Sequence, residues 1–302
     1  MGISQYIKEI GRGKDGARSL SREQAADLFG QVLDGAVTDL EVGGFCLAMR
    51  IKGETPHEMA GFLDATYTRL RRVPVTGKLP AVVLPTYNGA RKLPLLTPLL
   101  ALLLARDGLP VLVHGTATES TRVFASSVFE ALGFPAAAQI TPLCAGAVAF
   151  YPTEVLCPGL KRLLDVRRAV GLRNPAHSLV KLMNPCAGPA IVVGSYTHPE
   201  YALSMAAVFE LMGSTAMLLR GTEGEPVADA RRAPQMDGFV AGKRQLLHAA
   251  QAGPLAQVPE LPSGTDAVST AAYIRAVLDG RKPVPAPIAT QLEQLLHMAQ
   301  AS

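Results

Sequence analysis

From residue 81 onward, short apolar runs alternate with longer segments that have helical character. The runs AVVL (81–84), PVLVHGT (110–116), AIVVGS (190–195) and TAMLL (215–219) are apolar at nearly every position. A strand that is apolar on both faces must be covered on both sides, and parallel strands need a helix-length connection between them. The alternation therefore predicts an α/β domain over residues 80–302, with a central parallel sheet covered by helices.

The helices between these runs have recognisable ends. Residues 97–108 predict a helix with Thr97 as its N-cap and Pro98 in its first turn. Residues 120–133 predict a second helix, which Gly133 ends. Thr197 and Glu200 have the spacing of a capping box and predict a third, running to Gly213. After a Pro/Gly-rich stretch at 253–262, helix is expected near residue 265 and after residue 287.

The first 75 residues predict four short helices with clear start signals. Three hydroxyl residues, Ser21, Thr38 and Thr55, are each followed three positions later by Gln or Glu. In such a capping box the hydroxyl accepts a hydrogen bond from the third amide of the helix, and the Gln or Glu side chain returns to the cap. We therefore predict a helical domain over residues 1–75, joined to the rest by the linker VPVTGKLP (73–80).

Positive charge is concentrated in the middle of the chain. The net charge of the whole sequence is only +4. Residues 161–181, however, hold six cations and a single carboxylate, that of Asp165. A cluster of one sign this dense indicates an anionic partner.

Several classes of protein are not expected. The N-terminus has no apolar core after a basic start, so we expect no signal peptide, and the apolar run at 93–105 is too short and too interrupted by Pro to span a membrane. The four cysteines have no metal-binding spacing and are expected to be buried free thiols, as is usual in the cytoplasm. These features predict a cytoplasmic protein with no membrane partner and no zinc site.

Two long motifs resemble a known enzyme family. The segment LSREQAADLFGQVLDGAVTDLEVGGFCLAMRIKGETPHEMAGF (20–62) is similar to the N-terminal helices of the anthranilate phosphoribosyltransferases. VRRAVGLRNPAHSLVKLMNP (166–185) resembles a second segment of the same family. Within the superfamily, KEIGRGK, YNGARK and RGTEGE are similar to a YbiB-like branch, whose members are taken to be non-catalytic nucleic-acid binders.

The resemblance implies a fold and an assembly. The fold is a small N-terminal helical domain plus a large α/β domain with a central parallel sheet, of the anthranilate phosphoribosyltransferase and nucleoside phosphorylase type. It implies that residues of about 159–187 complete the helical domain. It also implies a homodimer joined through the helical domains.

The phosphate and metal motifs of the enzymes are altered here. The glycine-rich G-T-G-G-D turn corresponds to residues 85–89, which include Tyr87, Asn88 and Gly89, and bulky side chains replace glycines that let amides approach a pyrophosphate. The K-H-G-N motif corresponds to residues 113–116, which include His114, Gly115 and Thr116 but no lysine. The Asp-Glu pair that binds magnesium is matched only loosely by Glu223 and Glu225. We expect a vestigial anion site, no catalytic residue, no bound metal and no cofactor.

The leading functional hypothesis is sequence-independent binding of nucleic acid, DNA or possibly RNA, along a basic groove of the dimer. No helix-turn-helix, zinc-finger or RNP motif is present, so we expect phosphate contacts without base readout. Four clusters supply the candidate residues: Lys8, Arg12, Lys14 and Arg18; Arg91 and Lys92; Lys161, Arg162, Arg167, Arg168, Arg173 and Lys181; and Arg231, Arg232, Lys243 and Arg244.

Alternatives stay open at this point. Tyr87 either stacks on a base or packs over its own turn. Arg168 and Arg173 match the segment that lines the acceptor site in the enzymes and are either phosphate contacts or retained framework. The alternative function is that of an active magnesium-dependent phosphoribosyltransferase, which would act on an aromatic amine or base.

Overall fold

The N-terminal residues fold into a helical domain, as their start signals predict. The computed structural model describes residues 2–13, 15–254 and 258–301. The helices are α1 (Ser4–Ile10), α2 (Arg22–Asp34), α3 (Asp39–Lys52) and α4 (Pro56–Tyr67). All three capping boxes are confirmed: each cap hydroxyl accepts from the amide three residues on at 3.2 Å, and each cap amide donates to the returning side chain at 2.9 Å.

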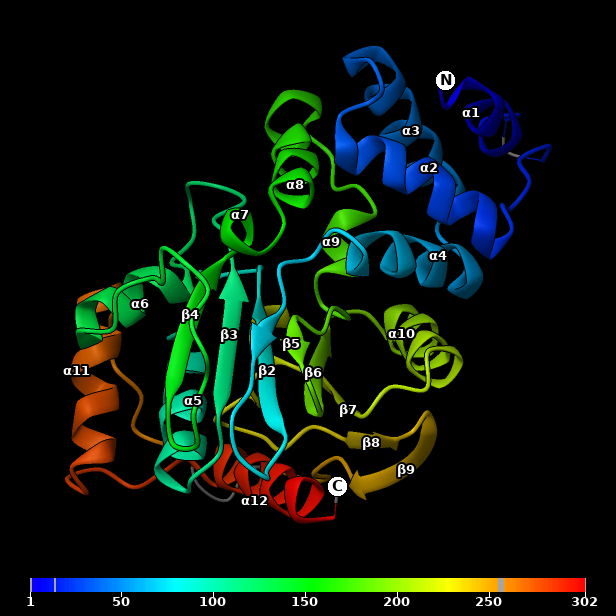
Figure 1. The fold of residues 1–302 in the computed structure, drawn as a ribbon. Helices are drawn as coiled ribbons and strands as arrows, with labels where there is room; N and C mark the ends of the chain where they lie inside the picture. The colour runs from blue at the N-terminus through cyan, green and yellow to red at the C-terminus, as the bar shows by residue number, and fades with distance from the viewer. Residues whose placement is uncertain (1, 14, 255–257, 302) are drawn as a thin grey trace.

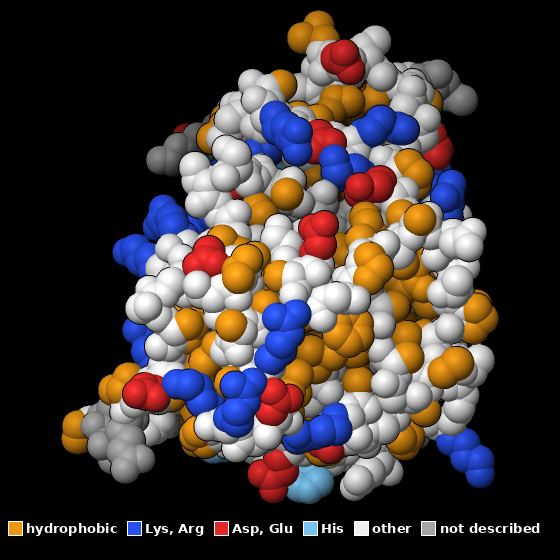
Figure 2. All heavy atoms as spheres, turned by 90° about the vertical axis from the view of Figure 1, so that its left-hand side faces the viewer, with side chains coloured by type: hydrophobic (Ala, Val, Ile, Leu, Met, Phe, Trp, Pro, Cys, Tyr) orange, Lys and Arg blue, Asp and Glu red, His pale blue; other side chains and the backbone are white. Residues whose placement is uncertain are grey.

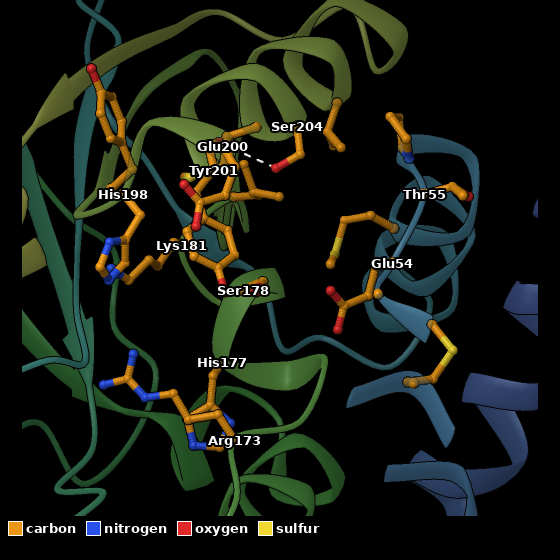
Figure 3. A pocket seen from close by; sticks show the side chains of 18 of the residues that line it. Glu54, Thr55, Arg173, His177, Ser178, Lys181, His198, Glu200, Tyr201 and Ser204 are labelled. Atoms are coloured by element: carbon orange, nitrogen blue, oxygen red, sulfur yellow. Dashed lines mark hydrogen bonds between the residues drawn. The ribbon is translucent and has the colours of Figure 1, made fainter. Parts of the chain in front are cut away.

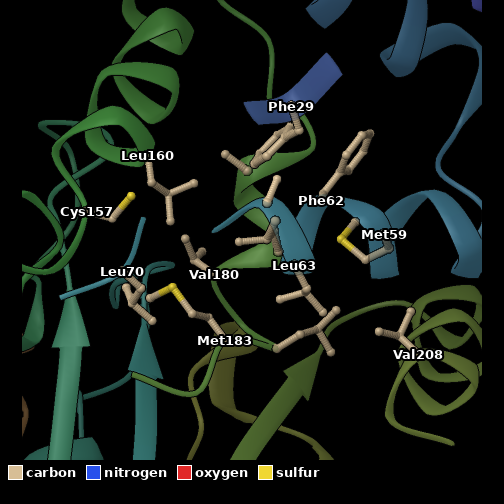
Figure 4. Close-up of a cluster of buried hydrophobic side chains, with 14 of the residues drawn as sticks. Phe29, Met59, Phe62, Leu63, Leu70, Cys157, Leu160, Val180, Met183 and Val208 are labelled. Carbon is tan, nitrogen blue, oxygen red and sulfur yellow. The ribbon is translucent and has the colours of Figure 1, made fainter. Parts of the chain in front are cut away.

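The core of this domain is aromatic at its centre. The rings of Phe29 and Phe62 are stacked with their centroids 4.6 Å apart, and Phe45 meets both edge-on. At Gly61 the helices α2 and α4 touch so closely that a Cβ would lie 2.2 Å from the carbonyl oxygen of Arg22. A later segment, α8 (Pro158–Val170), packs on α2 and adds its leucines, including Leu160, to the same apolar cluster (Figure 4).

The larger domain is built on a seven-stranded sheet of order β4-β3-β2-β6-β7-β8-β9. Five neighbouring strands are parallel, as predicted, and the last two pair antiparallel at one edge. Their bounds are β2 (Ala81–Thr86), β3 (Val111–Gly115), β4 (Val148–Pro152), β6 (Ala190–Tyr196), β7 (Ala216–Arg220), β8 (Met236–Val240) and β9 (Lys243–His248).

Alternating side chains of each central strand enter two separate cores. On β2, Val82 and Leu84 pack with α5 (Thr97–Arg106), α11 (Ala267–Leu278) and α12 (Ala286–Gln300). Ala81 and Val83 point to the opposite face, which α10 (Pro199–Leu211) and the helical domain cover. The two faces are therefore both buried, which explains why the strand residues are apolar at nearly every position. Figure 1 shows the helical domain above the carboxyl ends of the parallel strands.

The segment between the domains is partly ordered as strand. Within the predicted linker, β1 (Val73–Pro74) pairs in parallel with β5 (Cys186–Ala187) to form a separate two-stranded sheet. Two short helices, α7 (Thr153–Leu156) and α9 (Ala176–Leu179), flank α8, and a 3₁₀ turn, η1 (Thr222–Gly224), follows β7. No helix in the described part of the chain combines the length and apolar character that crossing a membrane requires.

Several local predictions were wrong. The N-cap of α5 is Leu96, because the Thr97 hydroxyl turns into the interior. The N-cap of α10 is His198 without a side-chain bond, so the box predicted at Thr197 does not form. Helix α6 (Ala125–Leu132) starts five residues late, since Val123 is extended and exchanges backbone hydrogen bonds with Ala90. Cys144 is exposed, whereas the other three thiols are buried as expected.

Candidate anion site and nucleic-acid interface

Two predicted phosphate motifs are neighbours at the carboxyl end of the sheet. The last residue of β2, Thr86, pairs with Gly115, the last residue of β3. The turn that follows, residues 87–93, therefore lies beside the end of β3, where open α/β sheets commonly bind ligands. Gly89 has φ of +68° in this turn, and a Cβ there would lie 3.0 Å from the carbonyl oxygen of Val123.

The carboxylate of Glu225 occupies the amides of this turn. Its Oε1 accepts hydrogen bonds from the backbone amides of Asn88 and Gly89, both at 2.8 Å. Its Oε2 accepts a hydrogen bond from the Thr86 hydroxyl and lies 3.4 Å from that of Thr97. Glu225 is fully buried. The donors that would face a phosphate in a glycine-rich turn thus meet a carboxylate of the same chain.

A second carboxylate, that of Glu223, occupies the next three amides. The backbone amide of Arg91 donates to Oε2 at 3.0 Å, and those of Lys92 and Leu93 donate to Oε1 at 2.7 and 3.0 Å. The Asn88 side-chain amide fixes the backbone by donating to the Glu223 carbonyl at 2.8 Å. Glu223 adopts φ of 52°, an uncommon conformation for a residue other than glycine.

Lys181 lies inside the protein next to these groups. Its Nζ donates to the carbonyl oxygens of Gly224 at 2.8 Å and Ser195 at 3.2 Å. Burial lowers the pKa of Lys181 to about 8, although the nearby Glu225 carboxylate acts in the opposite direction. Lys181 is 8% exposed, so it is not part of an exposed track of cations, contrary to its inclusion in the predicted basic groove.

Tyr87 packs over its own turn and does not face solvent. The side chain is 2% exposed, and its hydroxyl lies 2.8 Å from Nδ1 of His114 and 3.0 Å from the Thr153 hydroxyl. Burial raises the pKa of the Tyr87 phenol and lowers the pKa of His114 to about 3. The hypothesis that Tyr87 stacks on a base is therefore wrong. Thr116, beyond β3, is half-buried.

The acidic residues do not fit a magnesium ion. Magnesium requires carboxylate or water oxygens that are free to point at the ion in near-octahedral geometry. Both Glu223 and Glu225 instead accept hydrogen bonds from amides of the 86–93 segment. Across residues 2–13, 15–254 and 258–301, no group of three or more His, Cys, Asp or Glu side chains is placed to hold a metal.

Cations from three segments converge around this turn. Arg122, in the loop after β3, pairs with Glu119 and lies 3.8 Å from Glu223. Arg167 of α8 pairs with the same Glu119 at 2.5 Å. We call the cations of this surface the basic rim: Arg91, Lys92, Arg122, Arg167 and Arg173.

The basic rim contains more positive than negative charge. Its five cations surround the two carboxylates of Glu119 and Glu223. Burial would raise the pKa of Glu119, but the Arg122 and Arg167 guanidiniums together hold it below its usual value. Burial lowers the pKa of Arg173, and the charges of Arg167 and Arg122 lower it further. Such mutual repulsion among cations favours an added anion.

The other predicted cations lie on separate parts of the molecule. On α8, Lys161 pairs with Asp165, Arg162 donates to the Leu33 carbonyl, and Arg168 is largely exposed. Lys8, Arg12 and Arg18 lie on or after α1, at the edge of the helical domain away from α8 (Figure 1), while Lys14 lies outside the described residues. The predicted cations of the C-terminal third are all exposed: Arg231, Arg232, Lys243 and Arg244. Of these, Arg231 pairs with Asp229 and Arg244 with Asp237.

Figure 2 shows the side of the molecule on the left of Figure 1. On this face Lys and Arg side chains stand among carboxylates, with apolar side chains between them. The described residues of this face therefore do not form a continuous basic strip. The concentration of cations at the turn and α8 is local.

A cavity of about 450 Å³ lies between the helical domain and α10. Figure 3 shows its two sides, with Glu54 and Thr55 facing Lys181, His198, Glu200 and Tyr201. His177 and Arg173 lie at its end. Burial raises the pKa of Glu54 and lowers that of His177 to about 3, the latter also because of Arg173. The Nε2 atom of His177 is buried and has no hydrogen-bond partner among the described residues.

Sequence reasoning missed Arg122 and Glu119. Both residues follow a strand at its carboxyl end, and that position alone could have identified them as site residues. The sequence pattern instead predicts Arg122 within the helix at residues 120–133.

Comparison with known proteins identifies a matching family domain and two relatives that are similar over most of the chain. The helical bundle domain of a glycosyl transferase family matches residues 4–69. The uncharacterized protein YbiB of Escherichia coli (strain K12) is 40% identical, with 97% of this chain and 92% of the relative covered. The anthranilate phosphoribosyltransferase of Sorangium cellulosum (strain So ce56) is 31% identical, with 87% of this chain and 77% of the relative covered.

Solved structures show the same fold at lower identity. The anthranilate phosphoribosyltransferase of Thermus thermophilus has a TM-score of 0.76 at 22% identity, covering 98% of this chain and 89% of the other. The Saccharomyces cerevisiae enzyme, in complex with PRPP and Mg, has a TM-score of 0.71 at 14% identity, covering 99% and 89%. The predicted fold, a helical domain plus an α/β domain, is thereby confirmed.

Proposed function

The chain belongs to the anthranilate phosphoribosyltransferase superfamily, and we propose that within it this protein binds nucleic acid without sequence preference and does not transfer phosphoribosyl groups. The basic rim carries this proposal. Its five cations lie around a turn whose amides already hold Glu223 and Glu225. A small doubly phosphorylated sugar would have to displace both carboxylates, whereas a polymer can place phosphates against the rim from outside.

The chemistry of the rim favours phosphate contact over base readout. It consists of Lys and Arg only, and Tyr87, the aromatic residue of the turn, is buried. Arg91 and Lys92 are exposed, and neither side chain has an acidic partner within the described part of the chain. Contacts of this kind release counterions from the nucleic acid and contribute affinity that is independent of sequence.

Dimerisation through the helical domain would extend this surface. Helix α3 presents Leu40, Leu47 and Ile51 to solvent with exposed fractions of 87%, 43% and 77%. Their spacing of seven and four residues places them on one face of the helix. Apolar side chains on one exposed helix face are typical of an interface, and we include a homodimer through α3 in the proposal.

A salt titration tests the binding. We expect random single-stranded and duplex DNA oligonucleotides, and RNA of the same sequences, to bind with similar affinity. If all five rim cations contact phosphates, duplex affinity should fall by about 10²–10³ between ~50 and ~200 mM salt. Fluorescence anisotropy at several salt concentrations measures this. Binding that hardly responds to salt contradicts the proposal.

A matched pair of double variants locates the interface. Arg91→Ala with Lys92→Ala removes two exposed cations at the carboxyl end of the sheet. Lys78→Ala with Arg106→Ala removes two exposed cations near the opposite end, before β2 and at the end of α5. The first pair should reduce the salt slope by about two, and the second should leave it nearly unchanged. Equal effects would place the interface elsewhere.

A melting experiment with phosphoribosyl pyrophosphate distinguishes the transferase function from the proposed one. A ligand that binds only the native state raises the melting temperature. We expect phosphoribosyl pyrophosphate with Mg²⁺ to leave the melting temperature of this protein unchanged. A rise that depends on both would favour the transferase instead.

A further inference from the structure

We propose that the backbone amides of residues 91–93 form a phosphate site, which Glu223 occupies from within the chain and a phosphate of bound nucleic acid takes over by displacing this carboxylate. The identity of the incoming polymer rests on the proposed function. The site itself does not, because it is defined by backbone donors and one side chain.

The geometry of the donors defines the site. Three successive amides, of Arg91, Lys92 and Leu93, converge on the two oxygens of Glu223 at 3.0, 2.7 and 3.0 Å. Successive backbone N–H groups that point into one concavity form an anion-binding nest, and a phosphate oxygen accepts from it as a carboxylate oxygen does. The side chains of Arg91 and Lys92 are exposed at the same place.

The two internal carboxylates differ in how firmly they are held. Glu225 is fully buried, and hydroxyl groups as well as amides surround it. The Glu223 side chain is 18% exposed and takes its side-chain hydrogen bonds from the three amides. An incoming phosphate can therefore reach the Glu223 nest from solvent, whereas the Glu225 cradle is closed.

The displaced carboxylate has an alternative partner. Arg122 lies 3.8 Å from Glu223 Oε2, and its guanidinium can receive the carboxylate when the amides are taken. Exchange thus keeps the charge of Glu223 paired.

The test compares two carboxylates that contact the same arginine. Glu223→Gln and Glu119→Gln each remove one negative charge beside Arg122, from side chains that are 18% and 23% exposed. Only Glu223→Gln frees the amides of residues 91–93 from an ionic partner. Inorganic phosphate is titrated into each protein, and the backbone ¹⁵N–¹H resonances of residues 91–93 are followed.

We expect Glu223→Gln to bind phosphate about tenfold more tightly than Glu119→Gln, with shifts at residues 91–93, because a charge-assisted hydrogen bond is worth at least that factor. Equal phosphate affinity in the two variants, or shifts elsewhere only, overturns the proposal. Glu223→Asp provides a second variant with a shorter reach and should also gain phosphate affinity. Phosphate should raise the melting temperature of both Glu223 variants, which shows that they remain folded.

An oligonucleotide titration separates this inference from the proposed function. Glu223→Gln should bind DNA more tightly than Glu119→Gln by a similar factor. If the natural protein binds no oligonucleotide yet Glu223→Gln binds phosphate at residues 91–93, the nest is confirmed as a phosphate site and the nucleic-acid part is overturned. If DNA binds equally to both variants, displacement of Glu223 by the polymer is refuted.

Discussion

The carboxylate of Glu225 lies fully inside the protein, where an unpaired charge would cost several kcal/mol. Two amides and the Thr86 hydroxyl supply its hydrogen bonds, so that the burial is tolerated. The same bonds determine what the turn no longer offers to solvent. A single side chain, placed by a loop more than 130 residues away in sequence, therefore occupies amides that a phosphate in this turn would need.

His177 makes the stability of the protein sensitive to acid. Burial and the nearby Arg173 lower its pKa to about 3 in the folded state, from 6.5 for a free histidine. The unfolded chain therefore binds a proton that the folded chain does not between these pH values. The contribution of neutral His177 to the free energy of unfolding is fully present above pH 6.5. It is lost as the pH falls toward 3, by up to about 1.4 kcal/mol per pH unit.

We expect His177→Asn to lose less stability on acidification than the natural protein. The substitution keeps a polar side chain and removes the titration. Urea unfolding at several pH values between about 4 and 7 measures the difference. Parallel slopes for the two proteins would mean that His177 is protonated normally in the folded state.

For individual residues, the sequence predicted the site only in part. It located the altered turn and, through a loose match to the Asp-Glu motif, the pair Glu223 and Glu225. It could not show that both carboxylates turn onto amides of residues 88–93, since these contacts join segments on different strands. For the same reason Lys181 was assigned to the surface, although it lies beneath it.

The capping box at the start of helix α4 also connects this helix to neighbouring segments. Glu58 is fully buried and accepts hydrogen bonds from the Thr55 amide, the Leu20 amide at 2.9 Å and the Lys52 ammonium at 2.7 Å. The Lys52 side chain is only 8% exposed. Glu58 therefore ties the end of α3, the start of α4 and the chain before α2 together.

We expect Glu58→Ala to destabilise the protein by about 3–5 kcal/mol, because Lys52 is left as a buried unpaired charge. Gln24→Ala removes the equivalent side chain of the exposed box at α2 and should cost no more than about 1 kcal/mol. Thermal or urea unfolding compares the two. A small effect at Glu58 would show that water reaches Lys52 readily.

Elements were predictable where local rules decide them. The four N-terminal helices and the parallel strands follow from caps and apolar runs of the segments themselves. The strands β4, β8 and β9 were not predicted. Strand β4 pairs with β3, more than 30 residues earlier in the chain, and the residues of β8 and β9 are not uniformly apolar. The predicted start of α6 was wrong because Val123 is extended and forms a β-bridge with Ala90.

On the scale of the whole molecule, helix α3 carries an apolar face that no described residue covers in the monomer. On α3, Leu40 and Ile51 are the most exposed of its large apolar residues. A second copy of the chain would bury them, and two basic rims on one dimer would bind a polymer more tightly than one.

We expect Ile51→Glu to shift the protein to monomer and to weaken oligonucleotide binding, since a buried charge opposes the interface and avidity is lost. Val268→Glu is the control, because Val268 is 73% exposed but lies on α11 in the other domain. Sedimentation equilibrium measures the oligomeric state. An unchanged dimer in Ile51→Glu would place the interface outside α3.

The apolar cluster that α8 shares with α2 has a consequence for synthesis. Gly159 lies so near α2 that a Cβ would be 2.1 Å from the Leu33 carbonyl oxygen, and Leu160 and Leu163 fill the adjoining space. The first four helices leave the ribosome long before α8, which is made only after β2, β3 and β4. The apolar surface of the nascent helical domain that α8 later covers therefore stays exposed during about ninety residues of translation. A chaperone can bind this surface in that period.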